Sequence, residues 1–309
     1  MTGKLLGVIA VTALIFFSCA AEKNPEPDAV KAKIASFVGD DLFSITAKYE
    51  TGFESIDDFE GFYIVPQNHM STTSHSLTGT VKKSGGFSHY SWIYGANPVI
   101  TGTNTNHRGY PTIQLHKRQD GAFQGLVFCE LDVMLNITIT AEADKNWFSF
   151  ATFCSYSDDY WYRSYLINLD SNYRVHVMHV PGQGQSVQDI FQADDVFFPM
   201  NQWVRISVLI DYTASNQYGS PYIKAWQDGI PVSSARFNPR VDPNTVPQEQ
   251  WPDCLDTWDG STITQAESLC GLVYEGGLSQ AHFGMYAAPL IDSGEVWNDN
   301  LVIYELTRQ

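Results

Sequence analysis

Short runs in which apolar and polar residues alternate occupy most of the chain after residue 43. In the clearest run, at 203–211, an apolar residue stands at every second position: Val204, Ile206, Val208 and Ile210. Because successive side chains of a strand point to opposite faces, this run predicts a strand with one buried face. Similar runs, separated by turn residues, predict strands at 62–65, 88–94, 112–116, 125–136, 147–155, 163–169, 174–179, 222–227, 281–287 and 301–306. No strand–helix alternation accompanies them, so the pattern predicts an all-β sandwich or barrel.

The first residues have the features of an export signal. Lys4 precedes an unbroken apolar run at 5–17, which is too short to span a bilayer comfortably and has the length of a signal peptide. Cys19 follows, and its surroundings resemble a bacterial lipobox, which implies that Cys19 is lipidated and begins the mature protein. We expect a lipoprotein signal peptide at 1–18 and a protein anchored by lipid in the bacterial cell envelope, at the outer membrane or cell surface. Ordinary cleavage close to Cys19, which would release a secreted protein, is the alternative.

Two segments depart from the strand pattern. Residues 19–42 form a polar tether with a predicted short helix at 28–38. Residues 236–277 are rich in Pro, Asp, Asn and Gln, and the strand pattern resumes after them. Long loops without secondary structure are uncommon inside compact domains and are often functional. We therefore expect one domain at 43–309 that carries an insertion at about 236–277.

The cysteines support export. With Cys19 set aside, four remain: Cys129, Cys154, Cys254 and Cys270. An even number of cysteines in an exported chain predicts disulfides, and four cysteines allow three pairings. We expect Cys129–Cys154, because these residues lie on consecutive predicted strands, and Cys254–Cys270, because that bond would staple the insertion. No cysteine–histidine spacing predicts a zinc site.

Charge and composition narrow the classes of partner. The formal net charge of −16 argues against nucleic acid and against an anionic membrane surface, so the lipid anchor is the only membrane contact we expect. The chain has 8 Trp, 16 Tyr and 18 Phe, residue types that favour both strands and sugar-binding surfaces. Asp158-Asp159 and Asp194-Asp195 are acidic pairs without diagnostic calcium-loop spacing, so a solvated acidic surface is favoured. We expect no cofactor, with a structural calcium ion left open.

Two longer stretches carry a resemblance to a known fold. The segments 203–211 and 222–229 resemble adjacent strands of concanavalin-A-like lectin/glucanase jelly rolls, and 281–287 with 295–303 resembles their closing strands. The resemblance covers roughly residues 50–309 and implies a jelly-roll β-sandwich of two antiparallel sheets. That fold hosts lectins, glycosidases and polysaccharide lyases, so it implies a polysaccharide partner without naming the activity.

Two shorter motifs resemble the jelly-roll polysaccharide lyases of the alginate type. Gln114-Leu-His116 resembles their Gln-Ile-His strand, and His282-Phe-Gly-Met-Tyr286 resembles their Lys-Ala-Gly-Val-Tyr strand, with His282 in the place of Lys. On strands, Gln114 and His116 would share one face, as would His282 and Tyr286, while Gly284 would leave room for a sugar ring. The family's Arg-x-Glu-Leu-Arg strand is missing, and Arg108 is the only arginine between Cys19 and Gln114.

The lyase resemblance implies specific roles. β-Elimination of a uronate needs a base, a proton donor for the leaving oxygen, and neutralisation of the carboxylate, and the family shares these roles among Gln, Arg and His or Tyr. The catalytic candidates are therefore Arg108, Gln114, His116 and Tyr286. His282, His176 and the aromatic pair Tyr160 and Trp161 are the candidates for substrate binding.

Other readings of the sequence remain open. Laminarinase-type glycosidases of this fold use Glu-x-Asp-x-x-Glu on one strand, but here Glu130-Leu131-Asp132 is followed by Leu135 at the last acidic position. The retaining pair of carboxylates would therefore be broken. The alternatives to a polysaccharide lyase are a lectin-like carbohydrate-binding module, in which exposed aromatic rings hold the glycan, and a structural or adhesive surface protein.

Overall fold

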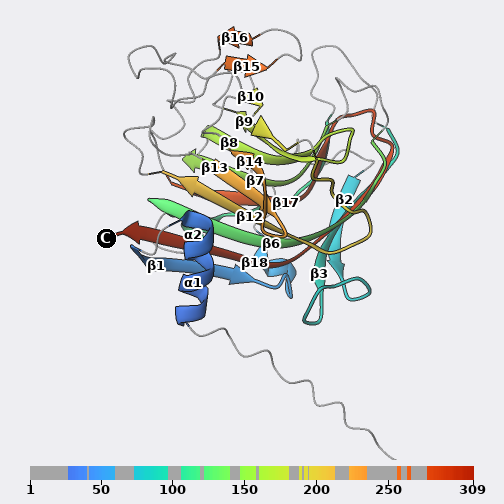
Figure 1. The fold of residues 1–309 in the computed structure, drawn as a ribbon. Helices are drawn as coiled ribbons and strands as arrows, with labels where there is room; N and C mark the ends of the chain where they lie inside the picture. The colour runs from blue at the N-terminus through green and yellow to red at the C-terminus, as the bar shows by residue number, and fades with distance from the viewer. Residues whose placement is uncertain are drawn as a thin grey trace, which may run out of the picture.

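The computed structural model describes residues 27–39, 42–59, 73–96, 106–118, 122–139, 147–157, 160–180, 188–189, 191–193, 195–212, 223–234, 256–258, 263–265 and 277–309. Most of the strands belong to two antiparallel sheets that pack face to face (Figure 1). The all-β jelly-roll sandwich of two antiparallel sheets that the sequence predicts is confirmed. The predicted strand at 62–65 lies outside the described residues.

The larger sheet, sheet A, contains nine strands. In spatial order they are β11 (Phe191–Gln192), β14 (Ile230–Ser234), β13 (Ile223–Gln227), β12 (Val204–Asp211), β6 (Leu126–Ile137), β18 (Ser293–Arg308), β3 (Ser88–Tyr94) and β2 (Thr73–Thr78). Strand β1 (Phe43–Thr51) pairs with the second half of the long strand β18, beyond the part that pairs with β3.

The smaller sheet, sheet B, contains seven strands. In spatial order they are β10 (Gln188–Asp189), β9 (Val175–Val180), β8 (Tyr160–Leu169), β7 (Phe148–Ser157), β17 (Gln280–Ala287) and β4 (His107–Gly109). Strand β5 (Thr112–Ile113) pairs with the first residues of β17. The remaining elements are helix α1 (Pro27–Val38), the 3-10 helix η1 (Ile56–Asp58), helix α2 (Leu115–Arg118), and strands β15 (Asp256–Trp258) and β16 (Ile263–Gln265), which form a two-stranded sheet.

The core lies between the two sheets and follows the alternation of the sequence. The apolar positions of β12, from Val204 to Ile210, are all buried in it, as predicted. They meet the inward side chains of sheet B, among them Phe283 and Met285. The Asp228-Gly229 pair forms a tight hairpin turn between β13 and β14. Its φ values are 48° and 82°, as this kind of turn requires.

Helix α1 covers part of the outer face of sheet A (Figure 1). Ile34 is fully buried there, and Phe37 contacts Phe128 and Trp226 with ring centroids 5.3 and 5.0 Å apart. Burying such apolar side chains stabilises the docked helix by removing their surface from water. The helix therefore belongs to the folded body of the protein.

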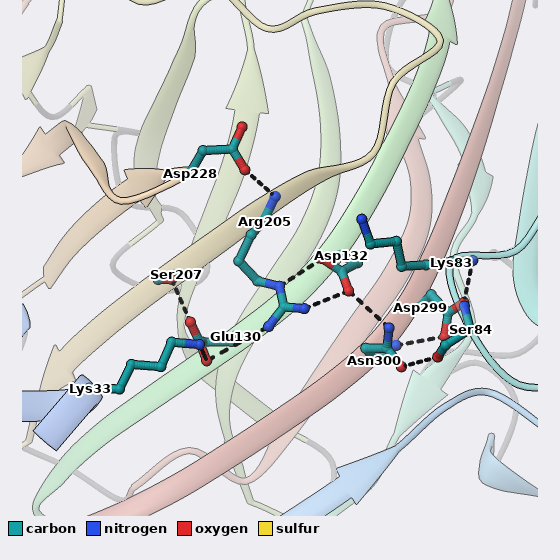
Figure 2. Close-up of polar contacts among 10 residues, drawn as sticks. All are labelled: Lys33, Lys83, Ser84, Glu130, Asp132, Arg205, Ser207, Asp228, Asp299 and Asn300. Carbon is teal, nitrogen blue, oxygen red and sulfur yellow. Dashed lines mark hydrogen bonds and ion pairs between the residues drawn. The ribbon is translucent and has the colours of Figure 1, made fainter. Parts of the chain in front are cut away.

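A network of charged and polar side chains also lies on this outer face (Figure 2). Glu130 and Asp132 project from β6 and are almost wholly buried. Arg205 on β12 donates two hydrogen bonds to the Asp132 carboxylate, at 2.6 and 2.7 Å, and its guanidinium lies 3.8 Å from Glu130. Lys33 of α1 adds an ion pair with Glu130 at 2.5 Å, and Ser207 donates a hydrogen bond to the same carboxylate at 3.1 Å. The two carboxylates are therefore structural: their ion pairs and hydrogen bonds link α1, β6 and β12.

The predicted disulfide Cys129–Cys154 is wrong, because both thiols are free. The two residues lie on β6 and β7, which are consecutive in the chain but belong to different sheets. Cys129 faces the core, whereas the sulfur of Cys154 lies 3.1 Å from Ser164 Oγ. Burial raises the pKa of both thiols, that of Cys154 to about 12. Cys254 and Cys270 lie outside the described residues, as does Cys19.

A buried histidine lies where β3 approaches β17. His89 is inaccessible to solvent and packs against Phe53 and Phe59. Its Nδ1 lies 3.3 Å from Asn298 Oδ1 and its Nε2 lies 3.3 Å from Nδ1 of His75. Burial, and next the proximity of His75, lower the pKa of His89 from 6.5 to about 3. The imidazole is therefore neutral in the folded protein at neutral pH.

Replacement of Arg205 tests the network on sheet A. In Arg205→Met the buried carboxylates of Glu130 and Asp132 lose their shared cation. We expect the free energy of unfolding to fall by roughly 2–3 kcal/mol, less than the ~3–5 kcal/mol of a fully buried pair, because 35% of the Arg205 side chain is exposed. In the control Lys33→Met we expect a loss of about 1 kcal/mol or less, since 46% of Lys33 is exposed. Chemical denaturation measures both, and equal losses would contradict the central role of Arg205.

The pH dependence of stability tests the buried state of His89. Its folded pKa lies below its unfolded pKa, so its contribution is fully present above pH 6.5 and is lost as the pH falls towards 3. In that interval the unfolded chain binds one more proton at this residue, which steepens the loss of stability by up to ~1.4 kcal/mol per pH unit. His89→Gln should flatten the curve of unfolding free energy against pH by up to that amount. Parallel curves for the variant and the wild type would show that His89 is protonated in the folded state.

Candidate functional site

Strand β17 carries core side chains on one face and candidate-site side chains on the other. Phe283 and Met285 point into the core, whereas His282 and Tyr286 lie on the opposite face, which we call the outer face of sheet B. The sequence-based prediction for the faces of these residues is therefore confirmed. Tyr286 is partly exposed, and His282 is 1% exposed.

Gly284 has a different role from the one expected. The strand bulges between Phe283 and Tyr286, and Gly284 has a φ of 121°. A Cβ at this position would lie 2.5 Å from Gly109 O and 2.9 Å from His89 Cε1. The missing side chain therefore lets β17 approach the backbone of β4 and strand β3, and the expectation of open space for a sugar ring is wrong.

Strands β4 and β5 bring two polar residues to the same face. Arg108 is the cross-strand partner of Tyr286, and its Cζ lies 5.4 Å from the centre of the Tyr286 ring, in a cation–π arrangement. Thr112 is the cross-strand partner of His282, and its hydroxyl lies 3.1 Å from His282 Nδ1. The register of β17 thus fixes an arginine, a tyrosine and a histidine side by side.

The electrostatics of this group keep the histidine neutral. Burial, and next the positive charge of Arg108, lower the pKa of His282 from 6.5 to about 3. A neutral imidazole has one nitrogen that donates a hydrogen bond and one that accepts. His282 therefore stays neutral at neutral pH and can accept a hydrogen bond, while Arg108 supplies the positive charge.

Aromatic rings surround Tyr286. Its ring centroid lies 5.0 Å from that of Tyr110 and 4.7 Å from that of Trp147, and Tyr110 also contacts His282 at 5.1 Å. Asn106 Nδ2 donates a hydrogen bond of 3.2 Å to the Tyr286 hydroxyl oxygen. Because Asn106 is the donor, the hydroxyl proton of Tyr286 remains available to another acceptor.

The face continues as a polar row across the sheet. Ser149 on β7 lies opposite Tyr286, Asn168 on β8 lies opposite Ser149, and His176 on β9 lies opposite Asn168. Ser149 and Asn168 are buried, whereas His176 is partly exposed. His176 therefore shares the face of Tyr286, separated from it by two strands.

The structure does not bring Gln114 and His116 into this row. The predicted strand at 112–116 ends at Ile113, and the chain enters helix α2 at Leu115. Leu115 is buried in the core from this helix, and Nδ1 of His116 lies 3.0 Å from the carbonyl oxygen of Ser279. The prediction that Gln114 and His116 share one face of a strand is therefore wrong, and His116 is held by a backbone contact.

Several predicted residues lie where their side chains are not described. Tyr160 and Trp161 belong to strand β8, but their side chains are outside the described set. The acidic pair at 158–159 and Asp194 also lie outside it. Within the described residues, no three His, Cys, Asp or Glu side chains come together as a metal site would require. No helix in the described part of the chain is long and apolar enough to cross a membrane.

Sequence reasoning missed most neighbours of Arg108 and Tyr286. The unassigned residues are polar or aromatic side chains of the same face: Asn106, Tyr110, Thr112, Trp147, Ser149, Thr152 and Asn168. A signal for some of them was present, because Arg108, Tyr110 and Thr112 stand at alternate positions of one extended segment. The others depend on cross-strand register, which the sequence does not display.

Comparison with known proteins yields distant structural likenesses only. No family model matches the chain, and no curated protein matches it in sequence. An endo-β-1,4-glucuronan lyase from the fungus Trichoderma reesei is 14% identical, with 84% of this chain and 95% of that chain covered and a TM-score of 0.48. The cellulose-induced protein Cip1 is 14% identical, with coverages of 82% and 96% and a TM-score of 0.47. The alginate lyase AlgAT5, of polysaccharide lyase family 7, is 13% identical, with coverages of 71% and 78% and a TM-score of 0.36.

Proposed function

We propose that the protein cleaves a uronate-containing polysaccharide by β-elimination on the outer face of sheet B. The observation that carries this proposal is the placement of Arg108 over the ring of Tyr286, with neutral His282 on the same face. A buried guanidinium favours an anionic ligand, and a uronate supplies a planar carboxylate that matches its paired donors.

The three side chains match the steps of the reaction. In β-elimination a base removes the proton next to the uronate carboxylate, the bond to the leaving oxygen breaks, and that oxygen gains a proton. Arg108 neutralises the carboxylate and the negative charge that develops on it. Tyr286 takes up the proton from the carbon next to the carboxylate and gives one to the leaving oxygen, so that it ends the reaction in its starting state, while neutral His282 accepts a hydrogen bond on the same face.

The aromatic cluster supports a second candidate function. Tyr110, Trp147 and Tyr286 contact one another through Tyr286 with centroid separations of 4.7 to 5.0 Å. Aromatic rings of this kind cover the apolar faces of sugars. The second candidate is therefore a lectin-like carbohydrate-binding module that holds the same class of glycan without cleaving it.

The cellular setting belongs to the same proposal. The apolar run at 5–17 followed by Cys19 supports export and lipid anchoring at the bacterial cell surface. Polysaccharide is the partner that fits such a location, since an anchored protein meets extracellular glycans. The acidic net charge of −16 makes local neutralisation by Arg108 more important for a polyanionic ligand.

A panel of polysaccharides with targeted variants tests the lyase reaction. The wild type should release unsaturated uronate from at least one polyuronide, detected by ultraviolet absorbance. Tyr286→Phe should lower the rate at least about 100-fold, because a proton-transfer group typically contributes 10²–10⁴-fold. Arg108→Met should also abolish cleavage through loss of carboxylate neutralisation. The control His116→Ala should keep the wild-type rate within about twofold, because His116 contacts the Ser279 carbonyl oxygen from helix α2.

The outcomes separate the two candidate functions. Melting temperatures confirm that each variant is folded, and Tyr286→Phe loses only the hydrogen bond from Asn106. Full activity of Tyr286→Phe would exclude the proposed role of the tyrosine. A wild type that binds a glycan in calorimetry but releases no unsaturated product would favour the binding module.

A further inference from the structure

Three alternate residues of one extended segment contact the side chain of Tyr286. Asn106 stands directly before strand β4, Arg108 lies within β4, and Tyr110 follows it. Asn106 Nδ2 donates a hydrogen bond of 3.2 Å to the phenol oxygen, Arg108 Cζ lies 5.4 Å from the ring centre, and the Tyr110 ring centroid lies 5.0 Å away. The contact from Asn106 is made at the oxygen, which is the atom that exchanges protons.

The buried residue His107 holds this segment in place. It is inaccessible to solvent, and its Nε2 lies 3.2 Å from the carbonyl oxygen of Pro289, beyond the end of β17. In the pairing of β4 with β17, His107 lies opposite Ala287. Because successive residues of an extended segment point to opposite faces, the burial of His107 turns Asn106 and Arg108 to the outer face of sheet B.

The ring of Tyr286 is held by packing, independently of Asn106. Trp147 packs edge-on against it with ring centroids 4.7 Å apart. Tyr110 contacts the ring as well, and Arg108 is both its cation–π partner and its cross-strand partner. The hydrogen bond from Asn106 therefore acts on the charge and the lone-pair direction of the phenol oxygen more than on the position of the ring.

The proposed reaction requires negative charge on this oxygen. To take a proton from carbon, Tyr286 must begin as a phenolate, and a charged oxygen accepts a stronger hydrogen bond than a neutral one. Asn106 supplies the donor from a carboxamide, which carries no charge of its own. The positive charge of Arg108 over the ring favours the same form of the tyrosine.

We propose that Asn106 is a positioning residue for the proton transfer by Tyr286. Its amide N–H holds the phenol oxygen and stabilises the negative charge there, and it leaves the other lone pairs of that oxygen for the substrate proton. A carboxamide has a donor end and an acceptor end, and this role requires the donor end at Tyr286. The inference rests on the proposed lyase function for the step in which Asn106 acts.

Two variants at position 106 separate the effect of the donor from that of shape. Asn106→Leu removes the donor at a similar volume. Asn106→Asp keeps the shape but replaces the donor with an acceptor, which repels a phenolate. The matched control is Asn136→Leu, because Asn136 is an exposed asparagine on sheet A whose Nδ2 donates a hydrogen bond of 2.9 Å to Glu295. Melting temperatures show that each variant is folded.

The expected result is a loss of rate without a loss of substrate binding. Asn106→Leu should lower kcat and kcat/KM by the same factor, at least about tenfold, since a hydrogen bond to a charged group is worth that much and Asn106 does not contact the substrate. Asn106→Asp should lower kcat at least as far, measured at saturating substrate because its added charge alone would raise KM for a polyuronide. The Asn136→Leu control should stay within about twofold of the wild type. A role in packing alone would leave kcat of Asn106→Asp at the wild-type value.

A second readout needs no substrate. Tetranitromethane nitrates the phenolate form of accessible tyrosines, and peptide mapping follows each tyrosine separately. Nitration of Tyr286 should be about tenfold slower in both variants at position 106, because the donor that stabilises its phenolate is gone. Tyr94, which is 64% exposed, is the internal control and should react as in the wild type.

The two readouts separate this inference from the proposed function. If the wild type cleaves a polyuronide and both variants at position 106 keep its rate, the role of Asn106 is excluded while the lyase function stands. If the wild type cleaves nothing but nitration of Tyr286 is slower in both variants, the lyase function is excluded while the action of Asn106 on Tyr286 stands. Slower cleavage with unchanged nitration would overturn the inference, because Asn106 would then act through another group. A wild type without cleavage and with unchanged nitration in the variants would overturn both.

Discussion

The alternation of strand β17 is the constraint on which the structure depends. Phe283 and Met285 must point inward to complete the core against sheet A, and this requirement leaves His282 and Tyr286 on the outer face. A shift of one residue in the register would bury the polar pair and expose the apolar one. Core packing and the geometry of the candidate site are therefore fixed by the same strand, and Gly284 allows that strand to approach β3 closely.

The buried polar groups on the two outer faces of the sandwich differ in how they are paired. On sheet A, Arg205 pairs with Asp132 and Glu130, and helix α1 covers the neighbouring apolar surface. On sheet B, a buried arginine lies beside a histidine that it helps to keep neutral, and Asn168 has an atom without a partner. The first arrangement pairs its charges within the chain, whereas the carboxamide oxygen of Asn168 costs stability.

The sequence correctly predicts the buried faces of strands, because these depend on periodicity. It fails where the same residues can form either a strand or a short helix. The alternation of β12 and of β17 predicts their buried faces correctly. The run 112–116 has the same alternation, yet Leu115 reaches the core from a short helix and takes His116 away from the sheet. The predicted disulfide Cys129–Cys154 is wrong for a related reason. Strands that are consecutive in the chain can belong to different sheets, and a strand pattern does not show to which sheet a strand belongs.

Most of the candidate site could not be predicted from the sequence, because strand pairing assembles it. Arg108 and Tyr286 meet only because β4 pairs with β17, and Ser149 and Asn168 join them through two further strand pairings. Serine, threonine and asparagine are common on strands that have a polar face, so residue type alone does not distinguish Asn168 from a solvated neighbour. What distinguishes it is burial without a hydrogen-bond partner, and that property exists only once the strands are paired. The arrangement of this face therefore depends on strand register and burial, which the sequence alone does not display.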